Sequence, residues 1–334
     1  MIPLGQFPHT RLRRMRSNKF TRSILQESNL LPEEIIYPIF ILDSDQDSLH
    51  IKSMSGQFRL GRQPLFRKIE MCLELGIRGI CLFPVVKDDR RTFDASEAYN
   101  SKGLMATRIS EVKKRFPEIS IIADVALDPF TSSGHDGLID ENNVIDNDKT
   151  LAVLQRQSLC YAEAGADVIA PSDMMDGRIG SIRKDLDRSG FDKTSILSYS
   201  AKYASALYGP FRSAVGSGDA LKGQSKETYQ MSIYNSREAL SEISSDLAEG
   251  ADMVMIKPAG WYLDVVRRVR EHVTIPVLAY QVSGEYAMIE EVSKSGLTNR
   301  RDCVLESLIS IKRAGSDGIL SYYALEAARW LREV

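Results

Sequence analysis

The sequence predicts an α/β protein folded as a single (βα)8 barrel, or TIM barrel, with an extended N-terminal arm. From Ile35 onward, short apolar runs rich in β-forming residues alternate with longer helical patterns. This alternation is typical of βαβ units around a parallel sheet. Several of the runs are continuously apolar, as expected of strands buried on both faces. No linker divides the 334 residues, and such barrels commonly exceed about 250 residues as one domain.

Eight strands are expected in order along the chain. Their ranges are 36–41, 77–84, 120–127, 167–172, 195–202, 252–258, 276–282 and 318–323. Four of them follow a helical pattern that ends in glycine, at Gly76, Gly165, Gly250 and Gly315. Glycine suits the left-handed residue that ends a helix before the chain enters a strand. The recurrence favours a barrel over residues 33–334 and leaves residues 1–32 as the arm.

The arm is basic, with Arg11, Arg13, Arg14 and Arg16 close together. A mitochondrial-type presequence or a nucleic-acid-binding arm would share this feature. The arm does not have the apolar core followed by small residues that is typical of a secretory signal. A solvated or subunit-gripping extension is the simpler interpretation, so we expect the arm to serve in oligomerisation.

The overall composition argues against several classes of protein. A net charge of −2 and a pI near 6.2 give no electrostatic reason to expect nucleic-acid binding. No apolar run approaches the roughly 18 residues of a membrane span. The four cysteines, Cys72, Cys81, Cys160 and Cys303, are far apart, so they indicate neither a disulfide framework nor a cysteine zinc site. A reducing cytoplasm fits this cysteine usage best.

The strand ends carry two lysines. Barrel enzymes place their active sites at the C-terminal ends of the strands. Lys202 ends the fifth predicted strand and Lys257 closes the sixth, so two amines should stand side by side at one mouth. Burial and a second ammonium both lower the pKa of a lysine, which supplies the free amine that forms an imine with a ketone. Alternatively, Lys257 extends to solvent from the strand end.

The connection after the fifth strand is unusually long, from residue 203 to about residue 235, and carries Arg212, Lys222 and Lys226. Loops of this length in a compact barrel are commonly functional lids or disordered segments. The cations suit a substrate carboxylate, which arginine can bind through two hydrogen bonds. The stretch 216–218, Gly-Ser-Gly, could instead cradle a phosphate, and a flexible surface loop is the plain alternative.

Acidic residues follow the third and fourth strands. Asp124, Asp128 and Asp136 could transfer protons or hold a hard cation such as magnesium, although turn-capping would also explain them. His135 lies among them without a second histidine at metal-ligand spacing. Residues 172–178 after the fourth strand, with Asp173 and Asp176, form a similar acidic turn or only a helix N-terminus.

Five stretches are specific enough to compare with known families. They are APSDMMDGR at 170–178, YSAKYAS at 199–205, YGPFR at 208–212, MVMIKP at 253–258 and YQVSGEYAM at 280–288. Together they resemble the δ-aminolevulinic acid dehydratase family, whose members are also called porphobilinogen synthases. The similarity covers nearly the whole chain. It implies that two 5-aminolevulinate molecules condense to porphobilinogen with loss of two waters, as a lyase reaction of tetrapyrrole (haem) biosynthesis.

The resemblance also implies roles for individual residues. Both lysines of the family form Schiff bases, so Lys257 would bind one substrate, with Ser283 and Tyr322 at its carboxylate. Lys202 would bind the other substrate. Three residues would hold that second carboxylate: Arg212, Lys226 and Gln230. Asp136 is expected among the substrate-binding residues, and the general base is expected to be Asp124 or Asp128.

The metal requirement is expected to differ from that of many family members, which carry three cysteines on a catalytic zinc. The matching positions here are Ala126, Asp128 and Asp136, which offer no thiolate and should not hold zinc tightly. The chain therefore resembles the zinc-independent, aspartate-rich branch, which responds to an allosteric Mg²⁺ at a subunit boundary. The matching acidic residue is Glu242, although a solvated helix glutamate would look the same.

Two positions depart from the family pattern. Ser133 stands where histidine is usual, which puts any role of that histidine in doubt. Trp261, soon after Lys257, is bulkier than the residues expected there, so it could reshape that side of the pocket. The family assembles as dimers within larger homo-oligomers, usually octamers, and its N-terminal arm wraps a neighbour.

Two other functions are compatible with a lysine-bearing barrel. A class I aldolase would need one imine lysine and commonly a phosphate site, so the paired lysines argue against it. A catalytically dead barrel could act as a binding subunit. The intact Lys202, Lys257, Arg212 and Ser283 argue against that function, while Ser133 keeps it open.

Overall fold

The computed structural model describes residues 5–216, 221 and 225–333. Eight parallel strands close into a barrel, because β1 pairs with β4 on one side and with β10 on the other. The barrel strands are β1 (Ile35–Leu42), β4 (Gly79–Val85), β5 (Ser120–Val125), β6 (Val168–Pro171), β7 (Ser195–Lys202), β8 (Met253–Lys257), β9 (Val277–Gln281) and β10 (Gly318–Ser321). The predicted (βα)8 barrel is therefore confirmed.

All eight predicted strands are present, and their ends differ from the prediction by at most two residues. The differences have a local cause. Ile77 was placed at the start of a strand, but its N–H donates to the carbonyl of Cys72 and completes the end of the preceding helix. Leu127 was placed at the end of a strand, but its N–H donates to the backbone carbonyl of Asp136 across the following loop.

A short hairpin was not predicted. β2 (Ser48–His50) and β3 (Phe58–Leu60) pair antiparallel, and β3 also joins the outer end of β1. Each strand has only three residues, and all three residues of β2 are exposed. A run this short shows no alternation of apolar and polar residues that would distinguish it from a loop.

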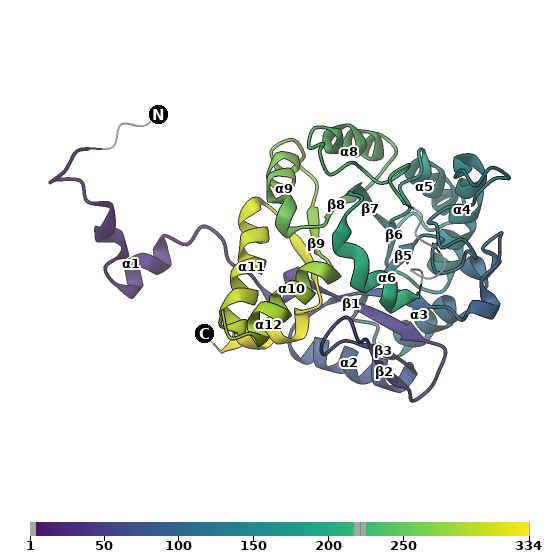
Figure 1. Ribbon diagram of the computed structural model, residues 1–334, viewed down its shortest axis with the longest axis horizontal. Coiled ribbons are helices and arrows are strands. Elements are labelled where there is room, and N and C mark those ends of the chain that lie inside the picture. Colours follow the sequence, from purple (N-terminus) through teal and green to yellow (C-terminus); the bar gives the residue numbers. More distant parts are fainter. Residues whose placement is uncertain (1–4, 217–220, 222–224, 334) are drawn as a thin grey trace.

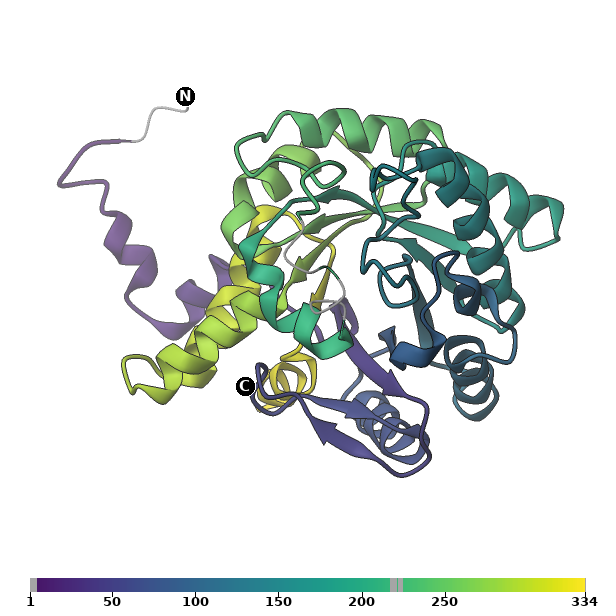
Figure 2. The ribbon, with the colours of Figure 1, turned by 45° about the vertical axis from the view of Figure 1, so that its right-hand side comes forward.

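The helices form a ring around the barrel (Figures 1 and 2). They are α2 (Arg62–Glu74), α3 (Leu104–Arg115), α4 (Asn147–Glu163), α5 (Arg178–Arg188), α8 (Glu238–Ala248), α9 (Leu263–Arg270), α10 (Ser283–Lys294), α11 (Arg300–Ala314) and α12 (Ala324–Arg332). Short 3-10 turns are η2 (Pro32–Glu34), η3 (Asp88–Arg90), η4 (Ser96–Tyr99) and η6 (Gly260–Tyr262). The four glycines predicted to end helices all have positive φ, from 86° at Gly76 to 119° at Gly315.

The N-terminal arm runs away from the barrel (Figures 1 and 2). It contains η1 (Leu12–Arg16) and α1 (Lys19–Ile24), and neither element buries a residue. Phe7 and Phe20 are 75% and 72% exposed. No helix in the described part of the chain has the length and apolarity that a membrane crossing requires.

The long connection after β7 contains a helix that the sequence analysis missed. η5 (Ala206–Tyr208) leads into α6 (Gly209–Val215), which begins with Gly-Pro and ends at Gly216 with a φ of 75°. Proline in the first turn is a helix-start signal, but glycine beside it favours a loop. Ser217, Gly218, Lys222 and Gly223 of the predicted lid lie outside the described residues.

Candidate active site

One pocket at the C-terminal end of the barrel collects eight of the ten predicted catalytic and substrate-binding residues. They are Asp124, Asp128, Asp136, Lys202, Arg212, Lys226, Gln230 and Lys257. Arg212 comes from α6, and Lys226 and Gln230 come from the segment that follows it. The remaining walls are Phe83, Ser172, Tyr208 and Phe211. The rule that strand ends carry the site indicated the two lysines and the aspartates, the long connection indicated Arg212 and Lys226, and the family resemblance supplied Gln230.

The two lysines stand side by side, as predicted. Lys202 on β7 and Lys257 on β8 are register partners in neighbouring parallel strands. Each is only 5% exposed, so neither extends to solvent. A register shift between Ser198 and Ala201 precedes the pair, and such irregularities commonly redirect side chains next to active sites.

Lys257 is surrounded by aromatic rings. Its Nζ lies 4.6 Å from the ring centroid of Tyr280 and 5.0 to 5.4 Å from those of Phe211, Tyr199 and Tyr208. Among the described residues it forms no ion pair. Burial, with the nearby Lys202 ammonium, lowers its pKa to about 8. Roughly a tenth of this amine is therefore neutral at a pH of about 7, far more than of an ordinary lysine, and the lowered pKa agrees with the prediction from sequence.

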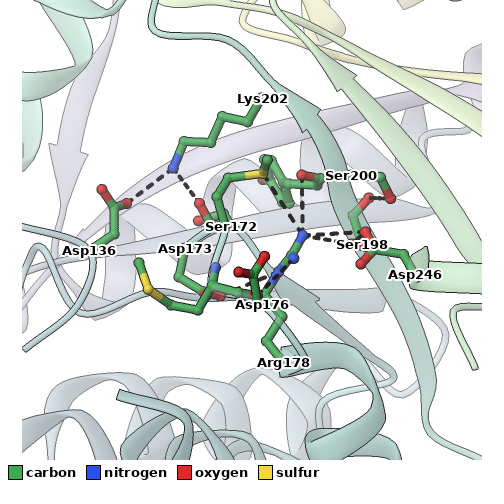
Figure 3. A network of polar contacts seen from close by, with 12 residues as sticks. Asp136, Ser172, Asp173, Asp176, Arg178, Ser198, Ser200, Lys202 and Asp246 are labelled. Atoms are coloured by element: carbon green, nitrogen blue, oxygen red, sulfur yellow. Dashed lines mark hydrogen bonds and ion pairs between the residues drawn. The ribbon is translucent and has the colours of Figure 1, made fainter. Parts of the chain in front are cut away.

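Lys202 has the opposite environment (Figure 3). Its Nζ lies 3.0 Å from Asp136 Oδ1 and also donates to the carbonyl of Ser172. Burial alone would lower the pKa of Lys202, but Asp136, Asp128 and Asp124 raise it above the ordinary lysine value. The two lysines therefore differ in protonation, which the sequence analysis did not predict.

Asp136 is the centre of the polar half of the pocket. Its Oδ2 accepts hydrogen bonds from Lys226 at 2.6 Å and from the Tyr229 hydroxyl at 2.9 Å. Burial opposes ionisation, but Lys202 and Lys226 outweigh it and hold the pKa of Asp136 well below its usual range. Tyr229 was not predicted as a site residue. Its position between Lys226 and Gln230 in the chain was the only signal.

The two candidate bases differ in their surroundings. Asp124 is 8% exposed, and its Oδ1 has no hydrogen-bond partner among the described residues. Burial raises its pKa to about 7, against the opposing effect of Lys257 and Lys202. Asp128 lies 3.8 Å from the Lys226 ammonium. A carboxyl that titrates near neutral pH can both accept and return a proton, so Asp124 is the better candidate.

Ser283 and Tyr322 lie beside the pocket rather than on its wall. The Ser283 hydroxyl accepts the N–H of Phe211 at 2.9 Å and donates to the carbonyl of Leu207 at 3.3 Å. The Tyr322 hydroxyl lies 2.9 Å from that of Tyr280, the ring nearest to Lys257. Both residues therefore adjoin the aromatic half of the site.

A second polar network stands behind Lys202 (Figure 3). Asp173 accepts the N–H of Met175 at 2.8 Å, and Arg178 begins α5. The Arg178 guanidinium lies 3.3 Å from Asp246 of α8 and 3.1 Å from the Ser198 hydroxyl. The acidic turn predicted at residues 172–178 is therefore mostly structural, and Ser172 alone of it lines the pocket.

The remaining candidates lie elsewhere. His135 is buried, with Nδ1 at 3.1 Å from the Tyr229 hydroxyl. Ser133 accepts the N–H of His135. Glu242 lies on α8, where burial raises its pKa. Trp261, which could have reshaped that side of the pocket, is 67% exposed and is not among the residues that line it. No group of three or more metal-binding side chains occurs within the described ranges.

Comparisons with known proteins agree with this geometry. The family model described as delta-aminolevulinic acid dehydratase matches residues 9–330. A delta-aminolevulinic acid dehydratase of Bradyrhizobium diazoefficiens is 49% identical, over 96% of this chain and 91% of the relative. A chloroplastic one from Physcomitrium patens is 47% identical, over 96% of this chain and 74% of the relative.

A solved structure is also similar over nearly the whole chain. It is the Toxoplasma gondii delta-aminolevulinic acid dehydratase (porphobilinogen synthase) in complex with the reaction product porphobilinogen. The two chains superpose with a TM-score of 0.95 at 46% identity, covering 97% of this chain and 92% of the other. By sequence and by structure, the chain belongs to the delta-aminolevulinic acid dehydratase family.

Proposed function

We propose that this protein is a lyase that condenses two molecules of 5-aminolevulinate to porphobilinogen, with loss of two waters, in tetrapyrrole synthesis. The observation that carries the proposal is the pair of adjacent buried lysines, Lys202 and Lys257, at one pocket. Membership of the family and a structural neighbour that holds porphobilinogen support the same reaction.

Lys257 acts on the first substrate. Its neutral amine attacks the ketone, and loss of one water leaves an imine that activates the adjacent carbon. Burial among the four surrounding rings removes this amine from water, and this loss of solvation, together with the Lys202 ammonium, favours its uncharged form. Ser283 and Tyr322, beside the same rings, are the proposed partners of the substrate carboxylate.

Lys202 acts on the second substrate, after it has lost the proton that Asp136 stabilises. Asp124, with a pKa of about 7, is the proposed acceptor for protons released in the pocket. Arg212, Lys226 and Gln230 supply hydrogen-bond donors for the second carboxylate. Because both substrates are held in one pocket, the condensation becomes effectively unimolecular.

The residues at the positions of the family's zinc cysteines do not fit zinc. Asp136 uses both carboxylate oxygens on lysines, and Asp128 lies near Lys226. Ala126 offers only its carbonyl, which accepts from Gln157. Zinc prefers thiolate and imidazole ligands at such sites. We propose that the reaction runs without a catalytic zinc.

We further propose Glu242 as the residue that holds an allosteric Mg²⁺. Its side chain is half-buried near Asp246 and Asp176, and these carboxylates together with burial raise its pKa. Carboxylate oxygens suit Mg²⁺, which keeps several of its waters and needs only one or two protein ligands. Asp246 is already paired with Arg178 and Asp176 is exposed, so Glu242 is the half-buried carboxylate left to meet the ion.

The arm is proposed to pack on a neighbouring copy in a homo-oligomer built from dimers. The supporting observation is that η1 and α1 bury nothing while they expose Leu12, Phe20 and Ile24. Exposed apolar patches of this kind mark protein–protein contacts. A cytoplasmic location is proposed on the four cysteines, all of which are free.

The function is tested by incubating the protein with 5-aminolevulinate after exhaustive chelation and following porphobilinogen colorimetrically. We expect product without zinc and more product with magnesium, and Glu242→Gln should reduce the response to magnesium. A requirement for zinc would contradict the proposed metal chemistry. If no product forms with either metal, borohydride trapping separates the rivals, because a dead barrel forms no imine and an aldolase traps a different substrate.

A further inference from the structure

Glu285 is a buried carboxylate that the proposed reaction does not use. It is the third residue of α10 and is 5% exposed. Its Oε2 accepts the N–H of Val282 at 2.7 Å and so caps its own helix. Among the described residues no lysine or arginine forms an ion pair with it. A buried carboxylate without a cation is costly, so its other contacts need an explanation.

Those contacts lead to the loop that carries Lys257. Glu285 Oε1 accepts the N–H of Gly260, and Oε2 lies 3.4 Å from the N–H of Ala259. Ala259 and Gly260 follow Lys257 after a single proline. One carboxylate therefore joins the end of β8, which carries Lys257, to the start of α10, which carries Ser283.

The loop after β8 and the first turn of α10 approach each other closely at Gly260. A Cβ added to Gly260 would stand 2.5 Å from Glu285 Oε1, so no side chain fits there without displacing the carboxylate. Burial raises the pKa of Glu285 to about 7, while its three backbone hydrogen bonds oppose the rise. Only a carboxylate offers acceptors in all three directions, because an amide replaces one oxygen with a donor.

The rest of the connection between Lys257 and Ser283 runs through the segment before α6. The Lys257 carbonyl accepts from Tyr203 N–H and from the Tyr208 hydroxyl, both at 3.0 Å. The Ser283 hydroxyl contacts Leu207 of η5 and Phe211 of α6. β8 and β9 pair only as far as Ile256 and Ala279. Glu285 therefore adds a direct link between the two segments beyond the end of this pairing.

We infer that Glu285 is a positioning residue that fixes the spacing between the Lys257 amine and the Ser283 hydroxyl, and so selects a keto acid over a neutral ketone at Lys257. The inference rests on the proposed function, in which these two groups hold the ketone and the carboxylate of one substrate. With a fixed spacing, only a molecule whose ketone and carboxylate have the matching separation can contact Lys257 and Ser283 at the same time.

The test compares two ketones in the full-length protein. 4-Oxopentanoate is the substrate without its amino group, and pentan-2-one replaces its carboxylate with a methyl group. Each is trapped on Lys257 with borohydride, which reduces the imine to a stable secondary amine, and the Lys257 peptide is quantified by mass spectrometry. The variants are Glu285→Gln and Gly260→Ala, which disturb the same contact from opposite sides.

Glu290→Gln is the matched control. Glu290 is a buried carboxylate on the same helix, but it pairs with Arg300 and the Tyr323 hydroxyl. Circular dichroism and thermal unfolding identify any variant that fails to fold. Gly260→Ala keeps the test available if Glu285→Gln does not fold.

We expect Glu285→Gln and Gly260→Ala to lower the ratio of trapped 4-oxopentanoate to trapped pentan-2-one by at least about tenfold, since a displacement of about 1 Å can lower a reaction rate about a hundredfold. Trapping of pentan-2-one should stay near the wild-type level, and the control should keep the wild-type ratio. An equal loss of both ketones, or an unchanged ratio, would overturn the inference. Absence of any trapped imine in the wild-type protein would overturn the proposed function, and the inference with it.

Discussion

The lowered pKa of Lys257 is tested most directly by removing its neighbour with Lys202→Met. After burial, the Lys202 ammonium is the largest cause of the lowered pKa of Lys257. Methionine keeps most of the side-chain volume without the charge. The negative charges of Asp124, Asp128 and Asp136 then act on Lys257 without the opposing charge of Lys202, so its pKa should rise.

The size of the effect follows from the protonation equilibrium. With a pKa of about 8, roughly a tenth of Lys257 is neutral at a pH of about 7. If the pKa rises by about one unit, that fraction falls to roughly one in a hundred. Since only the neutral amine attacks the ketone, imine formation at neutral pH should slow about tenfold, and its rise with pH should move upward.

The assay is the initial rate of borohydride trapping of 4-oxopentanoate on the Lys257 peptide, measured across pH. Lys226→Met is the matched control, because it removes a buried ammonium from the same carboxylate, Asp136, but Lys226 is not one of the main groups that shift the pKa of Lys257. A midpoint for Lys202→Met that equals the wild-type midpoint, or lies below it, would refute the explanation.

Three further substitutions test the polar contacts around the site. Asp136→Asn leaves two buried ammonium groups without their main counter-ion and should lower the free energy of unfolding, measured in urea, by about 3–5 kcal/mol. Arg178→Met leaves the buried carboxylates of Asp173 and Asp246 without their cation. It should lower the free energy of unfolding by a similar amount, with thermal unfolding as the readout. Gly284→Ala places a Cβ 2.5 Å from the Leu207 carbonyl; we expect a loss of about 1–3 kcal/mol and a raised KM. Any of the three that matches the wild-type protein contradicts the contact it tests.

The barrel and most of its pocket could be predicted because both depend on local and periodic signals. Each strand is a continuous apolar run, and each preceding helix ends at a glycine that adopts positive φ. Once the strands are numbered, the C-terminal ends are known, and with them Lys202, Lys257 and Asp124. The long, cation-bearing connection after the fifth strand indicated Arg212 and Lys226, and the family resemblance then supplied Gln230, which no periodicity identifies.

What could not be predicted depends on contacts between distant parts of the chain. Tyr229 reaches Asp136 across 93 positions in the sequence, and Glu285 reaches Gly260 across 25. The high pKa of Lys202 needed knowledge of which carboxylates face it, and Trp261 needed knowledge of the direction in which η6 turns it. Sequence spacing contains neither kind of information.

The contrast between the two lysines explains how one pocket can hold two copies of the same substrate in different roles. Lys202 and Lys257 are the same residue type at matched positions of adjacent strands. Aromatic rings and burial leave Lys257 able to attack a ketone near neutral pH, whereas Asp136 keeps Lys202 protonated. The first imine should therefore form at Lys257. Its substrate then occupies the aromatic half, so the second must bind among the cations near Asp136, where Lys202 has to release its proton first.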